Sequence, residues 1–463
     1  MTLPKRFPDR DEIAAVRAAV EDLEPGDVLE GERPEDENPS YKVAGRVMGR
    51  RDLGSAVFLD LVDRSGKVQL AFLVKEIARE VNVDLGDIIG VSGVPGKTKR
   101  GEPTLFVFEV PTLLAKTRAP LPDTFHGLTD VEARYRRRYL DLLMNEQTRA
   151  DFLLRARIVT AVRRHLDDDG FVEVETPVLQ PRYGGAFARP FVTHHNELDA
   201  DLYLRIATEL YLKRLIVGGL ERVYEIGKDF RNEGVSYKHQ PEFTMLEWYE
   251  AYADYRDTMA RIERLLESVA TEVLGGTAIT FRGHEIDLKA PWERLGFVES
   301  LERHELWTRD EAELRSWLTE RGVATNADRD WAQLIDHAFS HFVEPNLIQP
   351  TIVHDYPIEL SPFARTTDGD PLLTERFEYF AGGMELGNAF SEINDAEEQQ
   401  RRFALQAEQV EGELEDPDYL EALSYGMPPT GGLGLGIDRL AMLLSGRETI
   451  RDVILFPALK ERS

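Results

Sequence analysis

The sequence contains no cysteine, no long apolar stretch and few lysines. Without cysteine, disulfides, thiolate metal sites and cysteine nucleophiles are excluded, so any metal must bind oxygen or histidine. No segment approaches the ~20 apolar residues that a membrane-spanning helix needs. Charges interrupt residues Met1 to Val20, where a secretory signal would need an apolar core. We therefore expect a cytoplasmic protein that does not enter a membrane.

Acidic residues outnumber basic ones, 84 to 56, which gives the 463-residue chain a formal net charge of -28. Only 12 of the basic residues are lysine and 44 are arginine, a bias that favours a GC-rich genome or a high-salt cytoplasm. The net charge opposes nucleic-acid binding, since phosphates are bound by lysine and arginine, but local patches can still decide it. The length and the 42% hydrophobic content predict a globular protein of two or three domains.

Residues 41–117 alternate short apolar and polar segments between Gly, Asp and Ser turns. Such alternation predicts about five β-strands, and a helix-like segment from Val74 to Val81 precedes the fourth. This order fits an oligonucleotide-binding (OB) barrel, whose outer face and loops hold single-stranded nucleic acid. Residues 1–40 form a short extension before it, acid-rich from Glu30 to Glu37.

A linker at residues 118–140 is rich in proline and charge, and we expect the second domain at 141–463. The linker contains Tyr135-Arg-Arg-Arg-Tyr139, which could contact RNA phosphates or form interdomain salt bridges; the sequence favours neither. Downstream segments carry polar residues at alternate positions, as antiparallel strands do. A charged helical insertion is expected at about 256–346. The predicted class is therefore α+β.

Two blocks of this second domain suggest nucleotide chemistry. Arg231 and Glu233 begin a polar loop that ends at His239, and a strand with Phe243 follows. These side chains would grip a triphosphate and stack on a purine. The other block, Gly431–Leu444, is a small-residue strand that runs into an amphipathic helix with Arg439 near its start, and its glycines allow close backbone approach.

Together with Gly170–Pro177, a helix end followed by a short strand and a proline, these blocks resemble motifs one, two and three of class II aminoacyl-tRNA synthetases. The resemblance covers nearly the whole chain. It implies a catalytic domain with an antiparallel sheet of six or seven strands flanked by helices, and a homodimer formed through motif one. An N-terminal five-stranded OB barrel is typical of the aspartate, asparagine and lysine subgroup.

Three stretches resemble the lysyl enzymes of this class: Gly184–Asn196, Glu209–Leu215 and Glu385–Asn394. An ammonium side chain requires buried carboxylates with an aromatic or hydroxyl partner, whereas an aspartate pocket would need arginine and lysine. The candidate pocket residues here are acidic. The implied reaction is ATP-dependent activation of L-lysine to lysyl-adenylate, followed by transfer to the 3′ end of the tRNA for lysine, tRNA(Lys).

The resemblance also implies roles for single residues. Arg231 should hold the lysine carboxylate and then the α-phosphate, and Glu378 with Glu385 should bind Mg²⁺ through hard carboxylate oxygens. Recognition of lysine is assigned to Gly185 and Glu209 for the α-ammonium, Glu247, Tyr249 and Glu392 for the ε-ammonium, and Asn388 and Phe390 for the pocket wall. ATP binding is assigned to Arg231, Glu233, His239, Phe243 and Arg439, with Arg231 and Arg439 as the catalytic residues.

In the barrel, Phe58 and Gln69 match positions that in similar enzymes stack on and read the anticodon, and Arg50 is a further candidate. Three rivals remain. A synthetase of the same fold could use aspartate or asparagine, which the acidic pocket disfavours. An enzyme that lysylates a protein such as elongation factor P would lack the barrel, and an RNA-binding protein with a dead synthetase domain would not need Arg231, Glu378, Glu385 and Arg439.

Overall fold

The computed structural model describes residues 3–30, 39–122, 128–186, 188–328, 330–407 and 416–460. It contains two compact units: Met1–Arg134 with Tyr139–Asn145, and Tyr135–Arg138 with Glu146–Ser463. The predicted extension and linker thus lie partly outside the described residues, at 31–38 and 123–127. Across the described ranges, no helix is long and apolar enough to cross a membrane.

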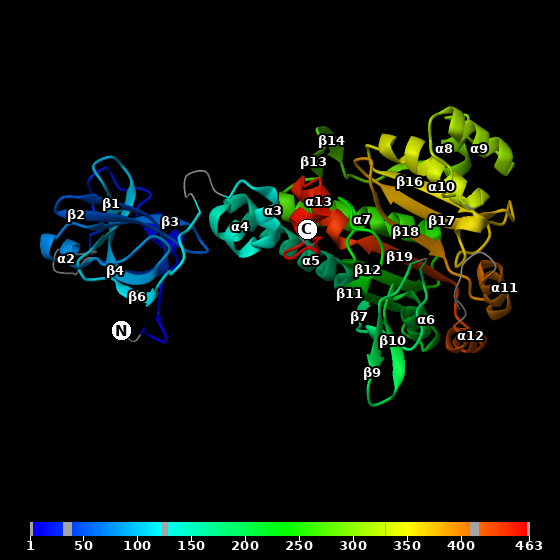
Figure 1. The fold of residues 1–463 in the computed structure, drawn as a ribbon, viewed down its shortest axis with the longest axis horizontal. Coiled ribbons are helices and arrows are strands. Elements are labelled where there is room, and N and C mark those ends of the chain that lie inside the picture. The colour runs from blue at the N-terminus through cyan, green and yellow to red at the C-terminus, as the bar shows by residue number, and fades with distance from the viewer. Residues whose placement is uncertain are drawn as a thin grey trace. The chain divides into compact units, whose positions relative to one another are not determined.

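The smaller unit contains a closed five-stranded barrel, as predicted from the alternating segments (Figure 1). Its strands pair in the order β1-β2-β3-β5-β4, and β4 pairs back with β1 to close the barrel while β6 extends from β4. Helix α2 precedes β4, where the helix-like segment was expected. The bounds are β1 Tyr41–Leu53, β2 Ala56–Val62, β3 Lys67–Phe72, α2 Lys75–Glu80, β4 Ile88–Lys97, β5 Pro103–Val107 and β6 Thr112–Ala115.

Alternation along β2 determines which side chains fill this barrel. Val57, Leu59 and Leu61 are buried in its core, so the residues between them face outward. Ile13 and Val16 of helix α1 (Ile13–Ala19) belong to the same core cluster. The segment predicted as an extension therefore contributes to the barrel core, a tertiary contact that its short helix does not reveal in sequence.

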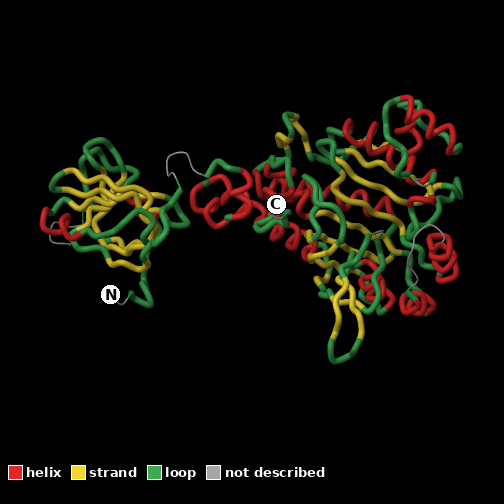
Figure 2. Tube along the Cα trace, in the orientation of Figure 1, coloured by secondary structure: helices red, strands yellow, loops and turns green. Residues whose placement is uncertain are grey.

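The larger unit is built on an eight-stranded sheet in the order β15-β16-β17-β18-β19-β12-β11-β7. Figure 2 shows the strands of this unit in yellow among helices in red. Six strands form an antiparallel centre, and a parallel strand is added at each edge, β7 beside β11 and β15 beside β16. The sheet is therefore mixed and larger than the six or seven antiparallel strands expected. The bounds are β7 Val172–Glu173, β11 Arg222–Phe230, β12 Glu242–Ala251, β15 Glu293–Gly296, β16 Thr351–Pro357, β17 Leu373–Phe380, β18 Glu385–Ser391 and β19 Thr430–Gly436.

Three helices cover one face of this sheet and form its largest core: α5 (Glu146–Asp168), α7 (Tyr255–Leu274) and α13 (Ile437–Ser445). Leu246 and Trp248 of β12 and Leu433 and Leu435 of β19 point into that core. The alternate residues of the same strands, including Glu247 of β12 and Gly432 and Gly434 of β19, must therefore lie on the opposite face. That face carries the candidate site.

The remaining elements of the larger unit surround the sheet. A second hydrophobic core packs three helices against the β16 edge of the sheet. These helices lie within the predicted helical insertion and are α8 (Phe297–Glu302), α9 (Glu311–Glu320) and α10 (Trp331–Phe342). Helix α6 (Glu209–Val217) packs against α12 (Pro417–Ser424), which contacts α11 (Ala396–Ala407). The small sheets comprise β8 Leu179–Gln180, β9 Val192–His195 and β10 Ala200–Leu204, and β13 Ala278–Phe281 with β14 His284–Asp287.

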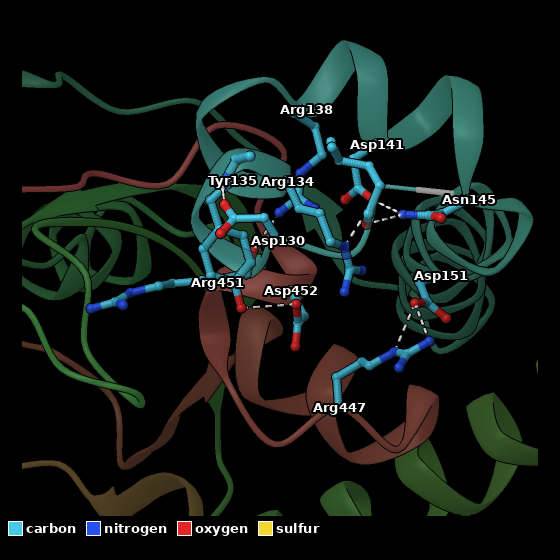
Figure 3. A network of polar contacts seen from close by, with 12 residues as sticks. Asp130, Arg134, Tyr135, Arg138, Asp141, Asn145, Asp151, Arg447, Arg451 and Asp452 are labelled. Carbon is cyan, nitrogen blue, oxygen red and sulfur yellow. Dashed lines mark hydrogen bonds and ion pairs between the residues drawn. The ribbon is translucent and has the colours of Figure 1, made fainter. Parts of the chain in front are cut away.

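The arginine run of the predicted linker lies at α3 (Val131–Arg136) and α4 (Arg138–Met144). Arg138 is fully buried and donates hydrogen bonds to the carbonyl oxygens of Arg451 and Leu455, at 2.7 and 3.0 Å. Figure 3 shows a neighbouring hydrogen bond, in which the Tyr135 hydroxyl donates to Asp452 at 3.1 Å. Arg138 therefore anchors the chain to the C-terminal segment of the larger unit, and its guanidinium is not exposed for phosphate contact.

Candidate active site

A cavity of about 300 Å³ opens on the polar face of the large sheet, where β11, β12, β18 and α13 meet. It is lined by residues that lie as far apart in the chain as Arg231 and Ile450. Glu385 and Asn388 lie along this cavity. So does every residue that the sequence assigned to ATP: Arg231, Glu233, His239, Phe243 and Arg439. The block that begins at Arg231 and the block Gly431–Leu444 thus meet at this cavity.

Arg231 follows the end of β11 and has an unsatisfied donor in this cavity. Its buried Nε has no hydrogen-bond partner among the described residues. Its guanidinium lies 5.1 Å from the centroid of the Phe243 ring. Since a buried cationic donor without a partner is costly, this geometry favours a bound carboxylate or phosphate at Arg231.

Arg439, at the start of α13, is held against β18. One guanidinium nitrogen donates to the backbone oxygen of Glu385 at 2.8 Å and to its carboxylate at 2.9 Å. Burial acts to raise the pKa of the Glu385 carboxyl, but the adjacent Arg439 guanidinium outweighs burial and lowers that pKa. The carboxylate at this edge of the cavity therefore carries its negative charge.

Glu378, on β17, is the second carboxylate assigned to a metal. It accepts hydrogen bonds from Arg376 at 2.6 Å and from the hydroxyl of Tyr356 at 2.9 Å. Burial raises the pKa of Glu378 to about 7, and repulsion from Glu385 adds to the shift. No group of three or more metal-ligating side chains occurs in the described ranges. Two mutually repelling carboxylates nevertheless match Mg²⁺, which is held through one or two carboxylates together with substrate phosphates.

Further along the same face, the sheet register aligns the residues assigned to lysine. Glu247 of β12, Gly434 of β19 and Asn388 of β18 form one row across three strands. Tyr249 and Phe390 flank a glycine of β19 in the next row. Because directly opposed residues point to the same side of a sheet, these side chains share one pocket.

The glycines of β19 make the space for this pocket. A Cβ added to Gly432 would lie 2.0 Å from Oε1 of Glu392 and 2.4 Å from Cε1 of Tyr249. Gly185, whose φ of 84° lies in the left-handed region, approaches from a separate loop. A Cβ there would lie 3.1 Å from Cβ of Glu209, so the backbone of Gly185 lies next to the carboxylate assigned to the α-ammonium.

Three buried carboxylates meet here from three elements: Glu209 on α6, Glu247 on β12 and Glu392 just beyond β18. Burial raises the pKa of each of them. For Glu247 the pKa reaches about 8, with Asp229 and Glu209 adding repulsion. The backbone N–H of Thr208 and the hydroxyl of Tyr249 each donate a long hydrogen bond of 3.4 Å to Glu247. Such a concentration of acidity favours a cationic ligand.

Among the residues of this pocket that the sequence assignments missed is a charged one, Lys213. Its side chain is completely buried, and its ammonium contacts Glu209 at 2.6 Å and also contacts Glu392. Although burial acts to lower it, these two carboxylates raise the pKa of Lys213. The only signal in sequence was its position four residues after Glu209 on one helix face.

In the barrel, the outward face of β2 presents Phe58, which is half-buried. Arg51 pairs with it across the strands and donates a hydrogen bond to Gln69 at 2.8 Å. Arg50 instead donates to the carbonyl oxygens of Val81 and Val83. Phe58 and Arg51 thus lie together on the outer face of the barrel, beside Gln69, which is itself buried and donates a hydrogen bond to Thr104. Arg50 is directed elsewhere.

Two protein families and many individual proteins are similar to this chain. The profile of the family described as tRNA synthetases class II (D, K and N) matches residues 130–460, and that of the OB-fold nucleic acid binding domain matches residues 41–113. A lysine–tRNA ligase of Carboxydothermus hydrogenoformans is 50% identical over 91% of this chain and 89% of its own length.

The chain belongs to the class II lysine–tRNA ligase family. Two other lysine–tRNA ligases have a similar degree of identity to this chain. The lysine–tRNA ligase of Dehalococcoides mccartyi is 49% identical over 91% of this chain and 87% of its own length. That of Halalkalibacterium halodurans is 48% identical over 94% and 90%. The class predicted from the three blocks, and the subgroup predicted from the barrel, are confirmed.

Proposed function

We propose that this lysine–tRNA ligase binds L-lysine in the pocket of Glu209, Glu247 and Glu392 and binds ATP in the adjoining cavity of Arg231 and Arg439. The convergence of three buried carboxylates from three elements carries this proposal, because the one lysine that contacts them, Lys213, cannot neutralise all three and a cationic ligand can supply the remaining charge. Both ammonium groups of lysine supply such charge. The lysyl group of the resulting lysyl-adenylate is then transferred to tRNA(Lys) in the cytoplasm, and AMP is released.

The first step needs positioning and charge neutralisation more than proton transfer. The lysine carboxylate attacks the α-phosphorus of ATP, a new O–P bond forms, and pyrophosphate leaves with the electrons of the broken bond. Arg231 would bind the attacking carboxylate and then the α-phosphate, since its Nε is free of protein partners in the described structure. Phe243 stacks on adenine, and Arg439 covers its other face. Glu233 and His239 contact the nucleotide from the loop.

Magnesium would bind at Glu378 and Glu385 and neutralise the phosphates. Arg376 and Arg439 already fix the orientation of these carboxylates. In the second step the terminal ribose hydroxyl of the tRNA attacks the adenylate carbonyl, an ester bond forms, and AMP leaves with the electrons of the broken anhydride bond. We assign anticodon binding to Phe58 and Gln69, with Arg51 in preference to Arg50 because Arg51 lies beside both.

A homodimer would cover an apolar surface around α5 and the edge strand β7. Leu153, Val172 and Leu179 are 64, 51 and 47% exposed, and Phe456, which lies in a cleft beside α5, is 71% exposed. Exposed apolar patches mark protein interfaces, and we infer that these side chains belong to the dimer interface. Light scattering on the purified chain should give twice the monomer mass, and a fully active monomer would refute the assignment.

The decisive assay is ATP–pyrophosphate exchange with each protein amino acid in turn, with magnesium and without tRNA. Exchange with lysine alone is expected. Glu392→Gln should reduce lysine-dependent exchange severely, whereas the matched change Glu397→Gln on the exposed face of α11 should not. Exchange with aspartate or asparagine would retain the fold and overturn the pocket, and loss of all exchange in the wild type would favour an inactive synthetase domain.

A further inference from the structure

Lys213 contributes a charge to the lysine pocket that none of the roles above uses. It lies one turn beyond Glu209 on α6, and none of its side-chain surface is exposed. Its ammonium contacts Glu209 at 2.6 Å and contacts Glu392, so one cation joins two carboxylates from separate elements. Breaking such a buried arrangement at one member leaves an uncompensated buried charge, which is strongly destabilising.

Aromatic rings enclose the same ammonium. The ring centroids of Phe363, Tyr249, Phe390 and Tyr419 lie 5.0, 5.8, 5.8 and 5.9 Å from Nζ of Lys213. Rings at this distance attract a cation electrostatically. The two carboxylates and the four rings together favour the charged form of Lys213.

We propose that Lys213 is a positioning residue of the lysine pocket and its built-in countercharge: it fixes Glu209 and Glu392 and leaves the three carboxylates with two charges, which the α- and ε-ammonium groups of lysine neutralise. This inference rests on the proposed function. Three carboxylates without Lys213 would exceed the positive charge that lysine brings to them, because the lysine carboxylate is paired with Arg231. With Lys213, the net negative charge of the pocket equals the positive charge of the two ammonium groups of lysine.

This charge balance predicts that the pocket carboxylates release protons when lysine binds. Other charged groups around the pocket are Asp229 on β11, which repels Glu247, and Arg376 on β17, which attracts Glu209. In the unliganded protein, burial and mutual repulsion favour protonated carboxylates, and the pKa of Glu247 lies at about 8. The two ammonium groups of lysine favour the ionised forms, so affinity should increase as pH rises toward about 8.

The test combines calorimetry on the wild type with lysine-dependent exchange by variants. Titration of L-lysine near neutral pH, in two buffers of different ionisation enthalpy, should show release of about one proton or more per lysine. Lys213→Met removes the attraction that opposes protonation of Glu209 and Glu392. It should therefore raise KM for lysine by about tenfold or more near neutral pH. The KM for ATP should stay within about twofold, and part of the loss should be recovered at higher pH.

Two further variants separate charge from folding. Lys213→Arg keeps the charge and should keep the wild-type pH dependence even where its bulk raises KM. The control Lys289→Met, at an exposed loop position, should change nothing. If Lys213→Met does not fold, the number of protons that the wild type releases per lysine and the pH dependence of Lys213→Arg still test the proposal.

Absence of proton release, or a Lys213→Met variant whose KM for lysine and pH profile match the wild type, would overturn the inference. A wild type that does not activate lysine would instead overturn the proposed function, so the two failures are distinguishable.

Discussion

Gly432→Ala tests whether the β19 glycines create the lysine pocket. The added Cβ would lie 2.0 Å from Oε1 of Glu392 and 2.4 Å from Cε1 of Tyr249. Gly432 is paired with Tyr249 on one side and Phe390 on the other, so its backbone cannot move away without disturbing both neighbouring strands. The carboxylate and the ring must shift instead, which should weaken lysine binding directly.

The magnitude follows from the contact that is lost. A hydrogen bond to a charged group is worth about 1.5–3 kcal/mol, which corresponds to about a 10–150-fold increase in KM for lysine. Overpacking of the sheet should also reduce the free energy of unfolding by about 1–3 kcal/mol. Because the ATP cavity is lined by other residues, the KM for ATP should change little.

Two other glycines provide a graded control. A Cβ on Gly434 would meet Cε of Met245 at 3.2 Å and Oδ1 of Asn388 at 3.4 Å, contacts that a flexible methionine can relieve. A Cβ on Gly276 meets no atom within 4 Å. Exchange kinetics should therefore rank Gly276→Ala as unaffected, Gly434→Ala as mild and Gly432→Ala as severe. A lysine KM in Gly432→Ala within about twofold of the wild type, with unchanged stability, would refute this reasoning.

Two further predictions concern the barrel and pH. Phe58→Ala should raise KM for tRNA in aminoacylation by about 5–150-fold, since stacking on an aromatic contributes about 1–3 kcal/mol per base. It should leave tRNA-independent exchange unchanged, and Phe108→Ala, at a 61% exposed aromatic of the same unit, should affect neither. The pKa of Glu247 is raised from 4.5 to about 8 in the folded chain, so the folded state holds a proton that the unfolded state releases. Without lysine, the free energy of unfolding measured in urea should therefore fall by about 1–3 kcal/mol as pH rises through this window. Glu247→Gln should remove that part of the pH dependence, and a wild type whose stability increases over the same range relative to this variant would contradict the shifted pKa.

The sequence alone determined the class of the protein, because the features that identify it are local. Alternation along residues 41–117 is enough to predict the barrel, since period-two patterns directly report one buried face. Arg231, Phe243 and Arg439 could be assigned because they lie within short blocks that resemble known motifs. The acidity of the lysine pocket was also visible, since Glu209, Glu247 and Glu392 stood out in those stretches.

Only the tertiary structure decided which side chains meet. Lys213 looked like an ordinary helical lysine, and its place between Glu209 and Glu392 depends on α6 packing against a strand end that lies about 180 residues away. Arg51 and Arg50 are neighbours in sequence, yet strand alternation sends them to different partners. A local pattern predicts the face on which a residue lies, whereas its charge partners come from distant parts of the chain that folding brings together.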